Sequence, residues 1–155
     1  MLRLALAWLH LVALAIGFGA VYSRGRSLAQ RPLTIHDVQR AFIADSWWGV
    51  AAGLWLVTGL WRLFGGVEKA ASYYQHNYLF VVKMAMFVAI LALEAWPMIT
   101  LIKWRTAVNK STDPLRPPEA TAAAISRISY IEATIILLIV LAAVAMARGY
   151  GERAP

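Results

Sequence analysis

Five ionisable side chains interrupt apolar stretches of this 155-residue chain that are long enough to cross a lipid bilayer. They are His10, Asp45, Lys83, Glu94 and Glu132. A charge at the centre of a membrane costs about 2.5–3.5 kcal/mol on insertion scales, so a protein retains one where it faces a partner or water. These side chains are therefore the candidates for binding a proton, a metal ion or a cofactor.

The stretches that hold these residues predict an all-α protein. Hydrophobic residues make up 61% of the chain and the mean hydropathy is +0.61, whereas soluble domains are about 45–50% apolar. A spanning helix needs about 20 apolar residues. We expect an integral membrane four-helix bundle in a single domain, residues 1–155, with helices at about 4–22, 41–63, 78–102 and 119–147. Pro97 is expected to kink the third helix.

The net charge of +7 is explained by orientation in the membrane rather than by nucleic-acid binding. If the helices alternate in direction, nine basic residues fall on one side: Arg24, Arg26, Arg31, Arg40, Lys103, Arg105, Lys110, Arg116 and Arg127. Five fall on the other side: Arg3, Arg62, Lys69, Arg148 and Arg153. Because cytoplasmic loops carry the excess of Lys and Arg, we expect a multi-pass inner-membrane protein with both termini in the periplasm, surrounded by lipid.

Depth along the helices predicts an outer site made of His10 and Lys83. Neutral imidazole is a common metal ligand, and haem b needs no covalent link. His10 is therefore either an axial ligand of haem iron or a buried imidazole that hydrogen-bonds to a neighbouring helix. Ala13, Gly17 and Ala20 share its helix face, which leaves room for a flat macrocycle or for close helix packing. Lys83 either neutralises an acidic group of a cofactor or substrate, or snorkels to the outer surface.

The same reasoning predicts an inner, acidic site made of Asp45, Glu94 and Glu132. Asp45 precedes Gly49 by four residues, so it shares the face of a Gly49-x-x-x-Gly53 motif that we expect to pack closely on another helix. Carboxyl groups at this depth handle protons or cations, or they form a static network. The cations expected to balance them are Arg127 and either Arg26 or Arg40.

Three segments resemble a bacterial family of small four-helix membrane proteins whose function is unknown. They are Ala44-Asp45-x-x-Trp48-Gly49, Tyr73-Tyr74-x-x-Asn77-x-x-Phe80-x-x-Lys83 and Ala147-Arg148-Gly149-Tyr150-Gly151. The resemblance covers nearly the whole chain. It implies the fold and the membrane location, and it implies no activity.

A weaker similarity connects the chain with HemJ-type protoporphyrinogen oxidases, and the general bundle is similar to CopD-type copper proteins. The matching segments are Leu9-His10 with Phe18, Tyr22 and Arg26; Val82-Lys83-Met84; and Arg127 to Glu132. This similarity implies haem b with His10 as the iron ligand, and a surrounding set made of Tyr22, Arg26, Lys83 and Arg127. Gly17 stands where the oxidases have a tryptophan, and Glu94 lies near the place of a histidine. Those departures count against the oxidase reaction more than against the cofactor.

The leading hypothesis from the sequence is a small membrane protein that binds b-type haem or a tetrapyrrole and transfers electrons, with quinone as a candidate redox partner. Asp45, Glu94 and Glu132 would move protons, and membrane oxidoreductase activity is left open. Two alternatives are a non-catalytic accessory subunit of a larger membrane complex and a small proton or metal transporter subunit. A homo-oligomer is compatible with each of them.

Overall fold

The computed structural model describes residues 1–65, 77–110 and 117–151. Its elements are α1 (Leu2–Leu28), α2 (Ile35–Phe64), α4 (Tyr78–Lys110) and α5 (Glu119–Ala147). All four are long and apolar enough to cross a membrane. The prediction of an all-α, four-helix membrane bundle is confirmed. Tyr73 and Tyr74, which carried part of the family resemblance, lie outside the described residues.

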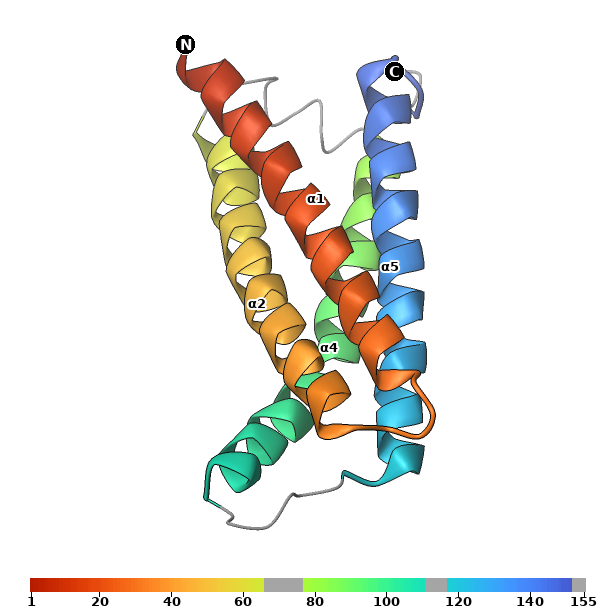
Figure 1. Ribbon diagram of the computed structural model, residues 1–155. Helices are drawn as coiled ribbons and strands as arrows, with labels where there is room; N and C mark the ends of the chain where they lie inside the picture. Colours follow the sequence, from red (N-terminus) through yellow and green to blue (C-terminus); the bar gives the residue numbers. More distant parts are fainter. Residues whose placement is uncertain (66–76, 111–116, 152–155) are drawn as a thin grey trace.

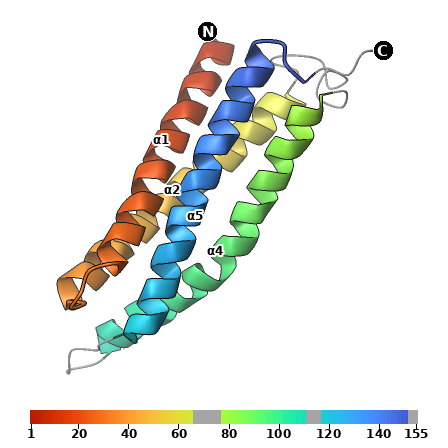
Figure 2. The same cartoon turned by 90° about the vertical axis from the view of Figure 1, so that its right-hand side faces the viewer.

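The helices form two antiparallel pairs (Figures 1 and 2). α1 packs most extensively on α2 and next on α5, α4 packs mainly on α5, and α2 touches α4 very little. The α1–α2 pair and the α4–α5 pair are therefore joined chiefly where α1 meets α5. The start of α1 and the end of α5 lie at one end of the bundle, and the α1–α2 connection lies at the other (Figure 1); we refer to that second end as the connecting end.

Two glycines of α1 allow the close approach of its neighbours. A Cβ atom on Gly17 would lie 3.0 Å from the Trp48 ring of α2, and one on Gly25 would lie 3.1 Å from the Cβ of Ser129 in α5. By contrast, a Cβ atom on Gly49 or Gly53 would meet nothing within 4 Å. The prediction that this second pair packs against another helix of the bundle is wrong.

A different stripe of α2 faces α1, because the helix is rotated relative to that expectation. Its buried members are Ala44, Trp48, Ala51 and Thr58, which recur at intervals of three, four and seven residues. Asp45 still faces the interior, with 12% of its side chain exposed. The interior position of this carboxyl was expected, but the reason given for it was not correct.

The helix ends show how the bundle is held at both ends. At the connecting end, Thr34 and Asp37 form a reciprocal capping box that begins α2. At the other end, the fully buried Asn77 donates from Nδ2 to the Tyr150 carbonyl at 3.1 Å, and its Oδ1 accepts from the Leu79 amide at 3.0 Å. Asn77 thereby caps α4 and ties its start to the segment after α5.

α4 changes direction in its second half, toward the connecting end (Figure 1). The buried Pro97 lies within the helix, and a proline there removes one backbone hydrogen bond and bends the axis. The predicted kink is therefore present. Beyond it, Arg105 donates to the Phe42 carbonyl at 2.6 Å, which holds the bent part of α4 against the start of α2.

Candidate functional site

The centre of the polar interior is Arg24 of α1, whose side chain is completely buried. Its Nη1 lies 2.9 Å from Asp45 Oδ1 of α2 and 2.7 Å from Glu94 Oε1 of α4. Its Nη2 lies 2.7 Å from Glu94 Oε2 and 2.8 Å from Glu132 Oε2 of α5. Its Nε donates to the Ser129 hydroxyl at 2.9 Å. All five N–H donors of this guanidinium are therefore used, and every other helix supplies one carboxylate.

We call these four charged side chains, Arg24, Asp45, Glu94 and Glu132, the Arg24 cluster. Glu94 binds in the bidentate geometry that makes guanidinium–carboxylate pairs strong and specific. Glu94 and Glu132 share the Nη2 nitrogen, and the two side chains are near enough for a hydrogen bond when one of them carries a proton. Glu132 Oε1 is buried and has no hydrogen-bond partner among the described residues.

The Arg24 cluster is enclosed between two apolar cores. One core, on the side of the termini, contains Val21, Trp48, Ile90 and Ala133. The other, on the connecting side, contains Leu28, Phe42, Leu101 and Ile125. On each helix the charged residue falls between a residue of the first core and a residue of the second. The charges are therefore surrounded by hydrocarbon, where electrostatic interactions are stronger than in water.

The charged side chains of this region differ in their exposure. The Glu132 side chain is 0% exposed, Asp45 and Glu94 are 12% and 13% exposed, and Arg105 is 39% exposed. Arg105 Nη2 lies 3.9 Å from Asp45 Oδ2. The partly exposed carboxylates of the cluster are therefore Asp45 and Glu94, and Arg105 lies beside Asp45, just outside the cluster.

The prediction that Asp45, Glu94 and Glu132 lie together is confirmed, but the predicted balancing cations are wrong. Arg26, Arg40 and Arg127 are exposed, and the balancing cation is Arg24. Arg26 follows Arg24 by two residues, a rotation of about 200° around the helix, so it points away from the interior. The signal for Arg24 was its place in the inward stripe of α1, after Ala13, Gly17 and Ala20. Ser129, which orients Arg24, was also missed.

His10, the centre of the predicted outer site, hydrogen-bonds to α2. Its Nδ1 lies 2.9 Å from the Thr58 hydroxyl, which donates its own hydrogen to the Leu54 carbonyl at 2.7 Å. With the Thr58 hydrogen on the Leu54 carbonyl, the tautomer of His10 that completes this bond carries its hydrogen on Nδ1 and leaves Nε2 as the acceptor. Lys83 lies near enough to His10 to interact with it electrostatically, and its ammonium group lies 5.3 Å from the centre of the Phe80 ring.

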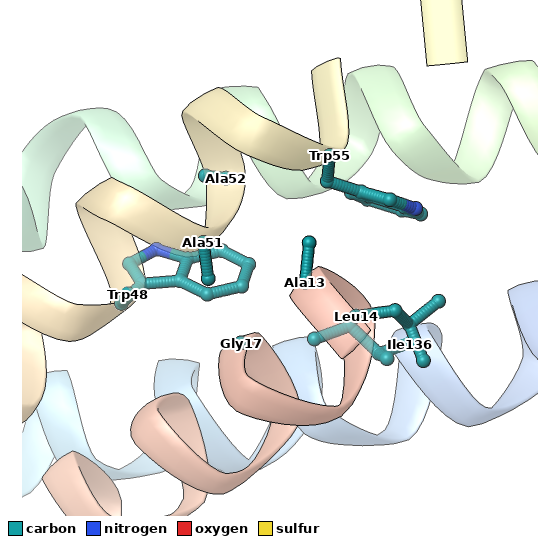
Figure 3. Close-up of a pocket in the computed structure, with 8 residues that line it drawn as sticks. All are labelled: Ala13, Leu14, Gly17, Trp48, Ala51, Ala52, Trp55 and Ile136. Atoms are coloured by element: carbon teal, nitrogen blue, oxygen red, sulfur yellow. The ribbon is translucent and has the colours of Figure 1, made fainter. Parts of the chain in front are cut away.

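The cavity that adjoins Trp55, a ring neighbour of His10, is too small for a haem. It measures about 10 Å³ and lies between Trp48 and Trp55 of α2, Gly17 of α1 and Ile136 of α5 (Figure 3). That is about the space of one water molecule, whereas pockets for organic ligands measure about 300–1,000 Å³. The small residues of α1 serve close helix packing here.

The side chains assigned to a cofactor by resemblance are distributed along the bundle. Arg26 follows His10 by sixteen residues of α1, which places their Cα atoms about 24 Å apart. Tyr22 stacks on Phe18 and meets the edge of Tyr130, and Arg127 is exposed. Haem b binding stays a prediction of the sequence. Within the described segments, no group of three or more His, Cys, Asp or Glu is arranged to hold a metal ion.

Four long apolar helices around a buried ionic cluster define a small multi-pass membrane protein. The chain belongs to the family described as "Predicted membrane protein (DUF2214)", which matches residues 2–151. This match confirms the family resemblance inferred from the three sequence segments. No curated protein and no solved structure matches the chain. The likeness to HemJ-type oxidases and CopD-type proteins therefore stays an interpretation of the sequence.

Proposed function

We propose that this protein binds and releases protons at the Arg24 cluster and so moves them within the membrane, alone or as a subunit of a proton-coupled complex. The observation that carries the proposal is the convergence of three carboxylates, one from each neighbouring helix, on a single completely buried guanidinium. Ionisable groups within membrane spans are rare and conspicuous, and they mark ion pathways and proton relays.

The Arg24 cluster contains three carboxylates and one guanidinium, and this excess of acidic groups supports proton binding. Arg24 keeps its charge because a guanidinium does not deprotonate in proteins. The carboxyl groups are therefore the members that can change charge. Glu94 and Glu132 repel each other when both are ionised on one nitrogen, and a proton between them removes that repulsion. Glu132 Oε1, which is buried without a hydrogen-bond partner among the described residues, is a further oxygen that can take up a proton.

The arrangement favours protons over metal ions as the transported species. The guanidinium occupies the position between the three carboxylates that a bound cation would need. A proton needs only a carboxyl oxygen, and Asp45, beside the half-exposed Arg105, offers the entry from the connecting end. We expect this end to face the cytoplasm, because the basic loops lie there.

Proton flux into proteoliposomes under a valinomycin-imposed potassium gradient tests the proposal, with an enclosed pH-sensitive dye as the readout. Wild-type protein should conduct protons, and Glu94→Gln and Glu132→Gln should not. The matched control is Glu119→Gln, because Glu119 is an exposed acidic residue at the start of α5. Wild-type flux no greater than that of empty liposomes, or equal flux in all variants, would reject proton conduction and leave a static ion-pair network.

The contacts of the described residues do not support the haem or redox role, and it is not part of this proposal. Its test is the absorption spectrum of detergent-purified protein from haem-sufficient cells. A Soret band that His10→Ala abolishes would restore that role. Quinone, a larger membrane complex and a homo-oligomer likewise stay predictions of the sequence.

A further inference from the structure

We propose that a groove between α1 and α2 binds an anionic phospholipid, independently of the Arg24 cluster. The groove has a volume of about 330 Å³ and lies on the surface of the bundle. Ala20 and Ala44 are its small, buried members, and Ile16, Ile43 and Trp47 supply exposed apolar side chains. Its polar members are Ser23 and Arg40.

The polar part of the groove lies where a phospholipid headgroup would be, and its apolar part lies where the acyl chain would be. Ser23 and Arg40 lie toward the connecting end, where α1 leaves and α2 enters the predicted apolar spans. Ile16 comes seven residues before Ser23 and Trp47 seven residues after Arg40, so both lie about 10 Å deeper in the hydrocarbon. A phosphate at the boundary and an acyl chain between the apolar side chains would match both parts at once.

Arg40 is placed to bind a phosphate. Its side chain is exposed, and it makes no hydrogen bond or ion pair within the described segments, whereas Arg24 and Arg105 are both bound to protein groups. Asp37, one turn before Arg40, is used in the cap of α2 and attracts Arg40 through its charge without forming an ion pair with it. A guanidinium binds two phosphate oxygens in a fork.

The position of the groove in the membrane selects an anionic lipid over a free anion. Arg26 is exposed three residues after Ser23, on the same side of α1, and adds a second positive charge. Basic pockets between membrane helices on the cytoplasmic side bind anionic headgroups. Inorganic phosphate would meet only the polar end of the groove and would leave its apolar length uncovered.

The probe is phosphatidylglycerol, titrated into phosphatidylcholine nanodiscs that contain the full-length protein, with the thermal unfolding midpoint as readout. We expect the midpoint to rise with the phosphatidylglycerol fraction. Arg40→Gln should need about fivefold more of the lipid for half of the effect, since one basic residue near an anionic surface contributes about that factor. The phosphatidylglycerol fraction that Arg40→Lys needs should lie between those of the wild type and Arg40→Gln.

Two controls make the result specific to this groove. Arg148→Gln removes an exposed arginine at the opposite end of the bundle and should behave as wild type. Ile43→Ala removes an exposed apolar side chain of the groove and should weaken the response while Arg40 is intact. The proposal is overturned if phosphatidylglycerol and phosphatidylcholine act alike on the wild type, if Arg40→Gln responds as the wild type does, or if inorganic phosphate in detergent reproduces the rise.

Discussion

Arg24 and Arg26 stand two residues apart in α1, and their surroundings have nothing in common. The first is enclosed by carboxylates from three helices, and the second is exposed. Their side chains are chemically identical, so burial alone decides that one is part of the candidate site and the other serves charge at the membrane surface. In a dry interior, a lone charge is far more costly than a paired one.

Replacing Arg24 should therefore destabilise the protein strongly. Arg24→Met leaves three buried carboxyl groups without their cation, and we expect a loss of about 3–5 kcal/mol in the free energy of unfolding. Arg26→Met should change it by less than about 0.5 kcal/mol, as exposed substitutions do. Denaturant unfolding in detergent, followed by circular dichroism, measures both. Similar losses in the two variants would contradict the assigned role of Arg24.

For single residues, the sequence predicts the acidic members of the site and misses the basic one, Arg24. Asp45, Glu94 and Glu132 are conspicuous because each interrupts an apolar run. Arg24 lies beside a polar turn with Arg26 and Arg31, so it has the pattern of an orientation signal. Only the helix, which continues to Leu28, carries Arg24 into the interior. A stripe of small residues that ends in an arginine was the available clue.

Among the elements, α1 determines how the bundle packs, because it touches both α2 and α5. The sequence predicted the helices well but assigned the close contact to Gly49 and Gly53 instead of Gly17 and Gly25. The reason is physical: α2 exposes large apolar side chains such as Trp47, Val50 and Leu54, so an apolar side chain does not show which face lies inside. Small residues therefore occur on inner and outer faces alike, and the sequence does not distinguish them.

The two kinds of glycine in α1 offer a matched test of this packing. Gly25→Ala places a methyl group 3.1 Å from the Cβ of Ser129 and 3.3 Å from the Ser126 carbonyl oxygen. We expect a loss of about 1–3 kcal/mol in the free energy of unfolding. Gly19→Ala meets nothing within 4 Å and should be neutral or stabilising by up to about 1 kcal/mol, through helix propensity. If the order of the two variants were reversed, the α1–α5 contact described here would be incorrect.

For the whole molecule, composition and span length were enough to predict the architecture. The predicted orientation rests on charge alone: one of the nine basic residues assigned to the cytoplasmic side, Arg24, is buried in the bundle, and the remaining eight still exceed the five on the other side. The chain has no cysteine, so single cysteines report their own location without interference.

Labelling with a membrane-impermeant maleimide tests that orientation. In intact spheroplasts, Leu2→Cys should react at once because the start of α1 is expected in the periplasm. Gln30→Cys, which follows α1, should react only after the membrane is permeabilised. Both residues are exposed to the surface of the protein, so accessibility differs only through the membrane. The opposite pattern would place the termini in the cytoplasm.

The two helix pairs meet along the seam between α1 and α5, and the Arg24 cluster draws members from both pairs: Arg24 and Asp45 from one, Glu94 and Glu132 from the other. The Arg24 guanidinium therefore links the two helix pairs through its ion pairs. Each proton that neutralises Glu94 or Glu132 removes part of the attraction across the seam. Protonation of the cluster and separation of the two helix pairs are therefore coupled, so a change in pH shifts how tightly the pairs associate.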